Sequence, residues 1–221
     1  MIAAVIFDMD GTLIDSVDLH AASWQRTFAQ FDHQIDYASI RAQIGKGGDQ
    51  LMPVFLPDEE VERVGPKMER FRKDLFKRDY LAKIRGFPEV PDLFRRILAD
   101  GKRTAIASSA KQDELAAFEK AAGIEGLVSE ETSSDDAERS KPFPDIFQAA
   151  LQRLSLPADQ AVVIGDSPHD AAAARAAGMA IIGVRCGGFA EADLRKAGCV
   201  EIYQDPQDLL RNYDRSLLGR G

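Results

Sequence analysis

Short apolar runs alternate along the chain with longer segments in which apolar residues recur every three or four positions. The runs are typical of strands buried on both faces of a sheet, and they are Ala3–Phe7, Thr104–Ala107, Ala161–Gly165 and Ala180–Val184. Between them, apolar stripes with helical spacing run from Val90 to Leu98 and from Ile146 to Leu154. Strands that alternate with helices predict an α/β fold with a parallel sheet covered on both faces.

The segment from Ser16 to Lys83 has only the helical pattern. Its first helix is predicted from apolar residues at helical spacing, namely Val17, Ala21, Trp24, Phe28 and Phe31. A second, highly charged helix is expected after a break at Gly65-Pro66, and no strand-like run stands out. We therefore expect an α-helical insertion at residues 16–83, and an α/β core formed by residues 1–15 and 84–221.

The composition is that of a soluble globular protein, with 221 residues of which 45% are hydrophobic and 29% are charged. No apolar run approaches the roughly 20 residues that a membrane-spanning helix needs. The first four residues lack the basic start and the long apolar stretch of a secretory signal. The two cysteines, Cys186 and Cys199, form neither a disulfide framework nor a zinc cluster. We therefore expect a cytoplasmic protein with no membrane partner.

Acidic residues outnumber basic ones, 36 against 28, for a formal net charge of −8. Nucleic-acid backbones are bound by basic surfaces, so no nucleic-acid partner is expected. Residues 16–83 are neutral, with 11 basic and 11 acidic side chains, and the whole deficit falls on the rest of the chain. An acidic region that handles an anionic ligand needs a positive charge from outside the protein, which indicates a metal ion.

Asp8 and Asp10 follow the first predicted strand and precede a glycine. Two carboxylates two residues apart at a strand end are expected to point the same way, and α/β proteins bind ligands at the carboxyl ends of their strands. An ordinary turn is the alternative, because Asp and Gly are common turn residues. An EF-hand calcium loop is excluded, since Thr12, Leu13 and Leu19 stand where it needs an oxygen ligand, a glycine and a glutamate.

A second pair of carboxylates, Asp166 and Asp170, follows the third apolar run. Ser167-Pro168 between them is typical of a helix start, where an acid in the first turn is favourable. Helix capping accounts for these residues but does not require Asp166. Together with Asp8 and Asp10 across the sheet, Asp166 predicts a cluster of hard oxygen ligands suited to magnesium.

Two further strand-to-helix junctions carry polar residues. Ser108 and Ser109 follow the second run, and at the start of a helix they would form a neutral phosphate cradle, with simple capping as the alternative. Lys141 precedes prolines and an acid that mark another helix start, so its cation would lie beside the positive end of a helix dipole. A neighbouring anion would relieve that repulsion, and a solvated surface lysine is the alternative.

These four junctions, in chain order, resemble the motifs of the haloacid dehalogenase superfamily over nearly the whole chain. The matching stretches are Asp8-Met9-Asp10-Gly11-Thr12-Leu13 with Asp15-Ser16, Ser108, Lys141-Pro142 with Pro144-Asp145, and Gly165-Asp166 with Asp170. The resemblance implies a Rossmann-like, doubly wound parallel sheet. The insertion resembles the α-helical cap of the phosphoglycolate phosphatase and β-phosphoglucomutase branch. Dehalogenases of the family lack the second Asp of the first motif, so Asp10 points to phosphoryl transfer.

The resemblance also implies two roles for the first motif. Asp8 would attack phosphorus and become an aspartyl-phosphate, while Asp10 would protonate the leaving alcohol and then deprotonate the attacking water. One carboxylate must therefore be ionised while its neighbour holds a proton, and close like charges push two such titrations apart.

The same resemblance assigns the remaining motif residues. Mg²⁺ would be held by Asp8, the backbone carbonyl of Asp10 and Asp166. Asp170 would orient a metal-bound water or Lys141. Lys141 would offset the charge repulsion between the nucleophile and the phosphate, and Ser108 would hydrogen-bond the phosphoryl group. Ser109, beside the motif residue, is a further candidate to bind the phosphate.

The insertion would close over this site as a cap and bind the leaving group. Lys46, in Gly45-Lys46-Gly47-Gly48, is a candidate to meet a carboxylate or second phosphate on the substrate, and an ordinary flexible linker is the alternative. No strand precedes this glycine-rich stretch, which excludes a dinucleotide site. His20 could face the cleft or pack at a hinge.

The leading hypothesis is a Mg²⁺-dependent phosphatase that acts on a small phosphorylated metabolite, similar to phosphoglycolate or a sugar phosphate. The alternative is a sugar phosphomutase of the β-phosphoglucomutase type, in which a second sugar hydroxyl replaces water as acceptor. A binding module on an inactive scaffold is disfavoured, because Asp8, Asp10, Lys141 and Asp166 are all present. No oligomeric state is predicted.

Overall fold

The computed structural model describes residues 1–220, apart from the side chain of residue 113. Within these residues, one sheet of six parallel strands has the order β3-β2-β1-β4-β5-β6. The strands are β1 Ala4–Phe7, β2 Arg103–Ala107, β3 Glu130–Thr132, β4 Ala161–Gly165, β5 Ala180–Val184 and β6 Glu201–Tyr203. The predicted α/β fold with a doubly wound parallel sheet is confirmed.

The four strands expected from apolar runs form the centre of this sheet, and the two that the sequence pattern missed are its edges. Strands β3 and β6 are three residues long, and neither is fully buried. An edge strand has one neighbour and is partly solvated, so it needs no continuous apolar run.

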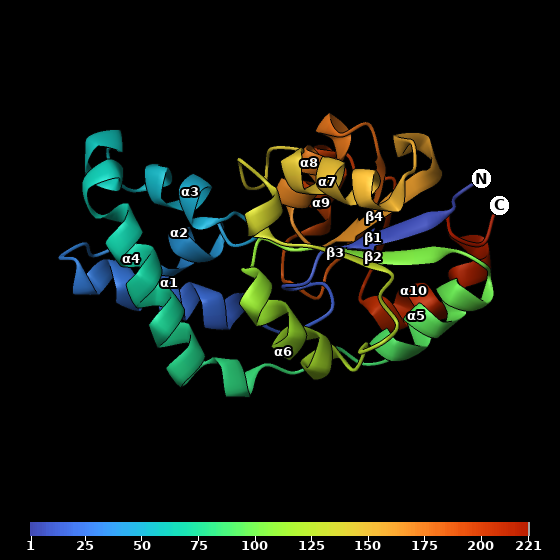
Figure 1. Ribbon diagram of the computed structural model, residues 1–221, viewed down its shortest axis with the longest axis horizontal. Helices are drawn as coiled ribbons and strands as arrows, with labels where there is room; N and C mark the ends of the chain where they lie inside the picture. The colour runs from blue at the N-terminus through green and yellow to red at the C-terminus, as the bar shows by residue number, and fades with distance from the viewer. Residues whose placement is uncertain (221) are drawn as a thin grey trace.

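Six helices cover the two faces of the sheet. Along β1, Val5 and Phe7 face one apolar cluster while Ala4 and Ile6 face the other. The first face is covered by α5 Val90–Ala99, α6 Gln112–Ala122 and α10 Pro206–Arg211, and the second by α7 Asp145–Leu154, α8 Pro168–Ala176 and α9 Glu191–Ala197 (Figure 1). Short 3₁₀ turns lie at Met52–Val54, Leu81–Lys83, Ser134–Asp136, Ala158–Gln160 and Tyr213–Arg215.

The segment expected as an insertion contains helices and no strand between residues 17 and 83, all of which the structure describes. Its helices are α1 Val17–Gln30, α2 Tyr37–Arg41, α3 Gly48–Leu51 and α4 Asp58–Asp79. They pack around an apolar cluster of their own, which includes Trp24, Phe28, Ile40, Leu51 and Met68. Figure 1 places these helices at the end of the molecule opposite to both termini.

The break expected at Gly65-Pro66 is wrong, because α4 runs without interruption from Asp58 to Asp79 with Pro66 inside it. A proline inside a helix costs roughly 3 kcal/mol through the lost hydrogen bond and the clash of its ring. Buried Met68, Leu75 and Phe76 follow on the same helix, and their packing offsets that cost. None of the helices formed by residues 1–220 combines the length and apolar character that a membrane crossing requires.

Candidate active site

Asp8 lies directly beyond β1, at the carboxyl edge of the sheet. Its side chain is buried, and its backbone amide donates to the Ile164 carbonyl at 2.9 Å. The chain then turns at Gly11, where φ is 82° and a Cβ atom would lie 2.5 Å from Oδ2 of Asp166. Glycine is therefore required at this position both for its conformation and for the close approach.

Lys141 joins this carboxylate from the segment before α7. Its side chain is completely buried, and Nζ lies 2.5 Å from Oδ1 of Asp8 and 2.8 Å from Oδ1 of Asp170. The ammonium also donates to the Ala107 carbonyl at 3.1 Å. The alternative of a solvated surface lysine is thus excluded, and the expected neighbouring carboxylates are present.

Asp166 follows β4 and completes the cluster. Ligand oxygens of Asp8, Asp166 and Asp170 all lie within 4.8 Å of one another. The Thr12 hydroxyl lies between two of them, 3.2 Å from Oδ2 of Asp8 and 3.3 Å from Oδ1 of Asp166. Asp170 is fixed by the expected helix start, since the amide and hydroxyl of Ser167 both donate to its Oδ2.

The concentration of negative charge changes the acidity of the whole cluster. Burial raises the pKa of Asp8 to about 7, against the opposing effect of Lys141. Burial and the charge of Asp170 likewise hold the pKa of Asp166 well above its ordinary value. Burial alone would lower the pKa of Lys141, but Asp170 and Asp8 raise it. One ammonium therefore faces three carboxylates that compete for it.

Asp10 has a separate set of partners. Its Oδ1 accepts a hydrogen bond from the Ser16 hydroxyl at 2.5 Å and lies 2.8 Å from Nε2 of His20, whose ring stacks on Phe76 of α4. Asp8 and Asp10 both lie in the loop beyond β1, which ends at Phe7, and both line the same cavity.

The surroundings of Asp10 set its acidity. Burial would raise the pKa of Asp10, but the charge and hydrogen bond of His20, with the Ser16 hydroxyl, lower it below its ordinary value. Asp8, the expected ionised nucleophile, is thus the weaker acid of the two, and Asp10, the expected proton donor, is the stronger. The reason is that Asp8 shares the crowded carboxylate cluster, whereas Asp10 faces a histidine.

Residues 5–184 match the family model described as haloacid dehalogenase-like hydrolase. The chain belongs to this family. It is 33% identical over 208 residues to the chloroplastic protein SUPPRESSOR OF QUENCHING 1 of Arabidopsis thaliana, a match that covers 92% of this chain but only 20% of that protein. It is 27% identical over 211 residues to a phosphoglycolate phosphatase of Rhodospirillum rubrum, covering 91% of this chain and 87% of the relative.

A crystal structure of a hydrolase from Pseudomonas syringae has the same fold. Its TM-score is 0.85 at 29% sequence identity, and the match covers 96% of this chain and 98% of that one. The chain is therefore a hydrolase of the haloacid dehalogenase-like family, in the group whose named relatives include phosphatases. The resemblance inferred from the four motifs is confirmed.

A magnesium ion fits the carboxylate cluster of this family member. Three buried carboxylates, those of Asp8, Asp166 and Asp170, offer oxygen ligands close together, while Lys141 supplies a single positive charge. Mg²⁺ prefers such oxygen ligands, and a second cation would relieve the repulsion that raises the pKa values of Asp8 and Asp166.

Ser108 and Ser109 differ in their positions. Ser108 is buried, and its hydroxyl accepts the Ala110 amide at 3.1 Å. Ser109 lies at the cavity between the insertion and the core, with its hydroxyl 3.5 Å from the Gly45 carbonyl. The expectation that they begin a helix is wrong, since α6 begins at Gln112 with its own capping residues. Both serines therefore occupy the loop between β2 and that helix.

The cavity beside Asp8 and Asp10 is closed on its far side by the insertion. The Gly45–Gly48 stretch connects α2 with α3 and lines this cavity, as do Lys46 and His20. Burial lowers the pKa of Lys46, whose ammonium donates to the side-chain carbonyl of Gln43 at 2.6 Å. The structure thus brings both predicted cap residues to the site.

Sequence reasoning missed two charged residues that line the same cavity, Arg72 and Glu114. The Arg72 guanidinium lies over the Trp24 ring, 5.2 Å from its centroid, and 3.4 Å from Nδ1 of His20. Arg72 is one of many charges on α4, and Glu114 resembles an ordinary acid in the first turn of α6. Neither had a local signal, because only the packing of α4 against α1 and the position of α6 at the same cavity bring them to the site.

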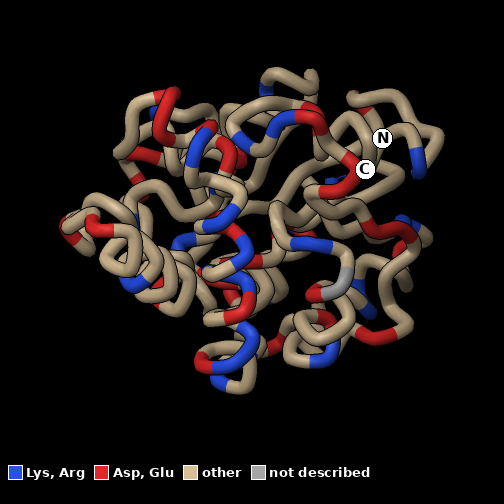
Figure 2. Tube along the Cα trace, turned by 60° about the vertical axis from the view of Figure 1, so that its left-hand side comes forward, with Lys and Arg blue, Asp and Glu red and all other residues tan. Residues whose placement is uncertain are grey.

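Further direct contacts hold the insertion against the core, in addition to those of Ser109 with Gly45 and of His20 with Asp10. Oδ2 of Asp49 accepts the Ser140 amide at 3.1 Å, the Arg41 guanidinium donates to the Gly187 carbonyl at 3.1 Å, and Nε2 of His169 lies 3.2 Å from the Ala42 carbonyl. Along the trace in Figure 2, basic and acidic residues are interspersed rather than gathered by sign.

Proposed function

We propose that this protein is a Mg²⁺-dependent phosphatase that hydrolyses a small phosphorylated metabolite through an aspartyl-phosphate on Asp8. The observation that carries the proposal is the contact of the buried Lys141 ammonium with both Asp8 and Asp170, beside Asp166. A buried cation and three carboxylates at the carboxyl edge of a parallel sheet suit phosphoryl transfer.

Asp8 is the proposed nucleophile. Lys141 holds Oδ1 and the Thr12 hydroxyl contacts Oδ2, so the carboxylate is fixed before substrate binds. Two unit charges of like sign about 4 Å apart repel by roughly 4 kcal/mol at an effective dielectric constant of 20, which opposes attack on a phosphate. Mg²⁺ held by Asp8, Asp166 and the carbonyl of Asp10 would supply the positive charge that offsets this repulsion.

Asp10 is the proposed acid and base. Its carboxylate would hand a proton to the leaving oxygen and later take one from the attacking water. His20 and Ser16 fix the side chain, and a phosphate group close by would raise the pKa that these two partners lower. Because His20 belongs to α1 of the proposed cap at residues 16–83, the position of the cap and the acidity of Asp10 are linked.

The remaining residues support this chemistry. Asp170 would orient Lys141, Ser108 and Ser109 would contact the phosphoryl group, and Lys46, which lines the cavity together with Ser109, would meet the leaving group. We propose the cytoplasm as the location and a small phosphorylated molecule as the partner.

The proposal is tested by phosphate release from a panel of phosphorylated metabolites with Mg²⁺. We expect turnover that Asp8→Asn lowers by roughly 10⁴-fold or more, because an amide cannot replace the carboxylate as the nucleophile. The control is Asp193→Asn, an exposed carboxylate in the first turn of α9. Interconversion of sugar phosphates with little phosphate release would instead identify a phosphomutase, and inactivity towards the whole panel would refute the proposed enzyme.

A further inference from the structure

A cavity of about 490 Å³ opens between the insertion and the core, next to the catalytic residues. It shares Trp24, Arg72 and Glu114 with the smaller cavity that contains Asp8. A phosphoryl group at Asp8 would therefore direct the rest of the substrate into the larger cavity. Ligand pockets of proteins commonly have about this size.

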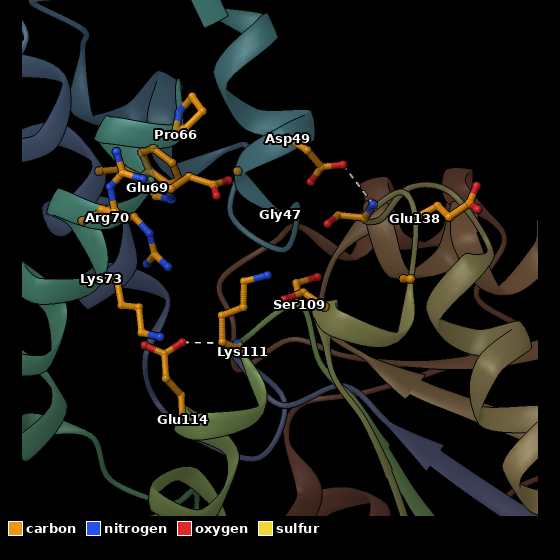
Figure 3. Close-up of a pocket in the computed structure, with 16 residues that line it drawn as sticks. Gly47, Asp49, Pro66, Glu69, Arg70, Lys73, Ser109, Lys111, Glu114 and Glu138 are labelled. Atoms are coloured by element: carbon orange, nitrogen blue, oxygen red, sulfur yellow. Dashed lines mark hydrogen bonds between the residues drawn. The ribbon is translucent and has the colours of Figure 1, made fainter. Parts of the chain in front are cut away.

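Glu114, which lines this cavity, is unusual among the lining residues in its burial and hydrogen bonding. The side chain is only 2% exposed, and its Oε2 accepts the Lys111 amide at 3.3 Å. Its Oε1 is buried and has no hydrogen-bond partner within the described residues. Figure 3 shows the side chain rising from α6 towards the cavity and towards Lys73 of α4. A buried carboxylate oxygen without a hydrogen bond is costly, so this atom has an acceptor site to offer a ligand.

The charges around the cavity limit the chemistry of that ligand. The cavity is lined by as many basic as acidic side chains. The basic ones are Arg70, Arg72, Lys73 and Lys111, and the acidic ones are Asp49, Glu69, Glu114 and Glu138. An anionic leaving group would be repelled by the buried carboxylate of Glu114, and an ammonium group would be repelled by the neighbouring bases. A neutral hydrogen-bond donor meets neither penalty.

We infer that Glu114 is a specificity-determining residue whose Oε1 accepts a hydrogen bond from a hydroxyl of a neutral, hydroxyl-bearing leaving group, as in a sugar or polyol phosphate. The inference rests on the proposed phosphatase function and narrows its substrate class. It separates such substrates from short phosphorylated acids, whose second charge would face Glu114 and whose few atoms would leave most of the cavity unfilled.

The test compares the kcat/KM values of different substrates for the same enzyme preparation. The fraction of active enzyme then cancels from each ratio. The probes are the best substrate from a panel of pentose, hexose and polyol phosphates, the n-alkyl phosphate with the same number of carbons, and 2-phosphoglycolate. For wild type we expect kcat/KM to be at least about tenfold higher for the hydroxylated probe than for either other compound, since a buried charged acceptor favours the substrate that satisfies it.

Glu114→Gln is the informative variant, because its amide keeps the shape and the oxygen that accepts the Lys111 amide while the charge is lost. We expect it to lower the kcat/KM ratio of hydroxylated to alkyl substrate about tenfold. Glu125→Gln, the same change at an exposed site beyond α6, is the matched control and should leave the ratio unchanged.

A measurement on wild type alone keeps the inference testable if Glu114→Gln does not fold. Among monodeoxy analogues of the best substrate, one position should lose about 10- to 100-fold in kcat/KM, because its hydroxyl is the donor to Glu114. Phosphate release with an unchanged ratio in Glu114→Gln, or with a preference for 2-phosphoglycolate, would overturn this inference and leave the phosphatase intact. Absence of phosphate release from every compound would overturn the phosphatase itself.

Discussion

The two sides of the active-site cavity are constructed in opposite ways. On the sheet side, Asp8, Lys141 and Asp170 are at most 4% exposed and are joined by two short ion pairs. On the helical side, Lys46 and Arg72 are partly exposed and contact an amide and aromatic rings instead of a carboxylate cluster. Charges interact strongly where water is excluded and weakly where it is not. Substitutions on the sheet side should therefore lower both stability and activity, whereas substitutions on the helical side should change the use of substrates with little effect on stability.

Lys141→Met tests the sheet side of this comparison and should have the largest effect. Removal of the ammonium leaves Asp8 and Asp170 buried without their partner, and breaking a buried ion pair from one side costs about 3–5 kcal/mol. We expect the free energy of unfolding in urea to fall by that amount at neutral pH, with activity abolished. The loss should be smaller in acid, where the carboxylates take up protons.

Lys111→Met is the matched control, because Lys111 pairs with Asp135 at 2.9 Å on the surface, where both side chains are about half exposed. Its unfolding free energy should change by less than about 1 kcal/mol. Equal losses in the two lysine variants would show that burial does not distinguish the two sides.

Mg²⁺ provides the second challenge, because a cation that binds the folded cluster must stabilise the fold. At 100 times its dissociation constant, Mg²⁺ should add about 2.7 kcal/mol to the unfolding free energy. Asp166→Asn removes one proposed ligand and should abolish most of this gain, whereas the exposed carboxylate change Asp159→Asn should retain it. Thermal unfolding with EDTA and with Mg²⁺ measures both, and an unaltered melting temperature of wild type would contradict the assigned metal site.

The same contrast explains how much of the site the sequence could reveal. Asp8, Ser108 and Asp166 each directly follow a central strand, so the topology of a parallel sheet brings them together without any knowledge of side-chain packing. Lys141 is not adjacent to a strand, and its place was implied by the motif resemblance rather than by the fold pattern.

No comparable rule of topology predicts which residues of the helical side line the cavity. Arg72 lines the cavity from α4, which continues through Gly65-Pro66, where local propensity predicted a break. Glu114 is explained in sequence as a helix-start acid, and only the three-dimensional packing exposes its free oxygen to a cavity. The short edge strands were missed for a related reason, since partial solvation removes their apolar signal.

A smaller effect is expected from Gly47→Ala, which tests closure on the helical side. A Cβ atom at Gly47 would clash with the side chain of Ser140, so the loop of the insertion and the loop of the core would have to separate. A displacement of about 1 Å near a reacting group can lower activity about 100-fold. We expect kcat/KM to fall by about 10- to 100-fold while the unfolding free energy changes by less than about 1 kcal/mol.

The partner substitution shows whether closure is the cause. Ser140→Gly removes the two atoms closest to the new methyl group, and the third, Oδ1 of Asp49, belongs to the insertion itself. The double variant Gly47→Ala/Ser140→Gly should therefore recover most of the lost activity relative to Ser140→Gly alone. Purely additive losses would place the effect of Gly47→Ala elsewhere than in this contact.

Asp49→Ala should have the smallest effect, because it removes one exposed hydrogen bond from the same closure. Oδ2 of Asp49 accepts the Ser140 amide at 3.1 Å across the gap between insertion and core (Figure 3). Such a bond contributes about 0.5–1.5 kcal/mol, and here it is made only while the two parts are in contact. We expect KM to rise about two- to tenfold with no measurable change in unfolding, and Asp49→Asn, which keeps an oxygen acceptor, to behave like wild type. A large fall in the unfolding free energy would contradict the comparison. It would mean that this contact between the helical side and the core contributes as much to stability as the buried ion pairs of the sheet side.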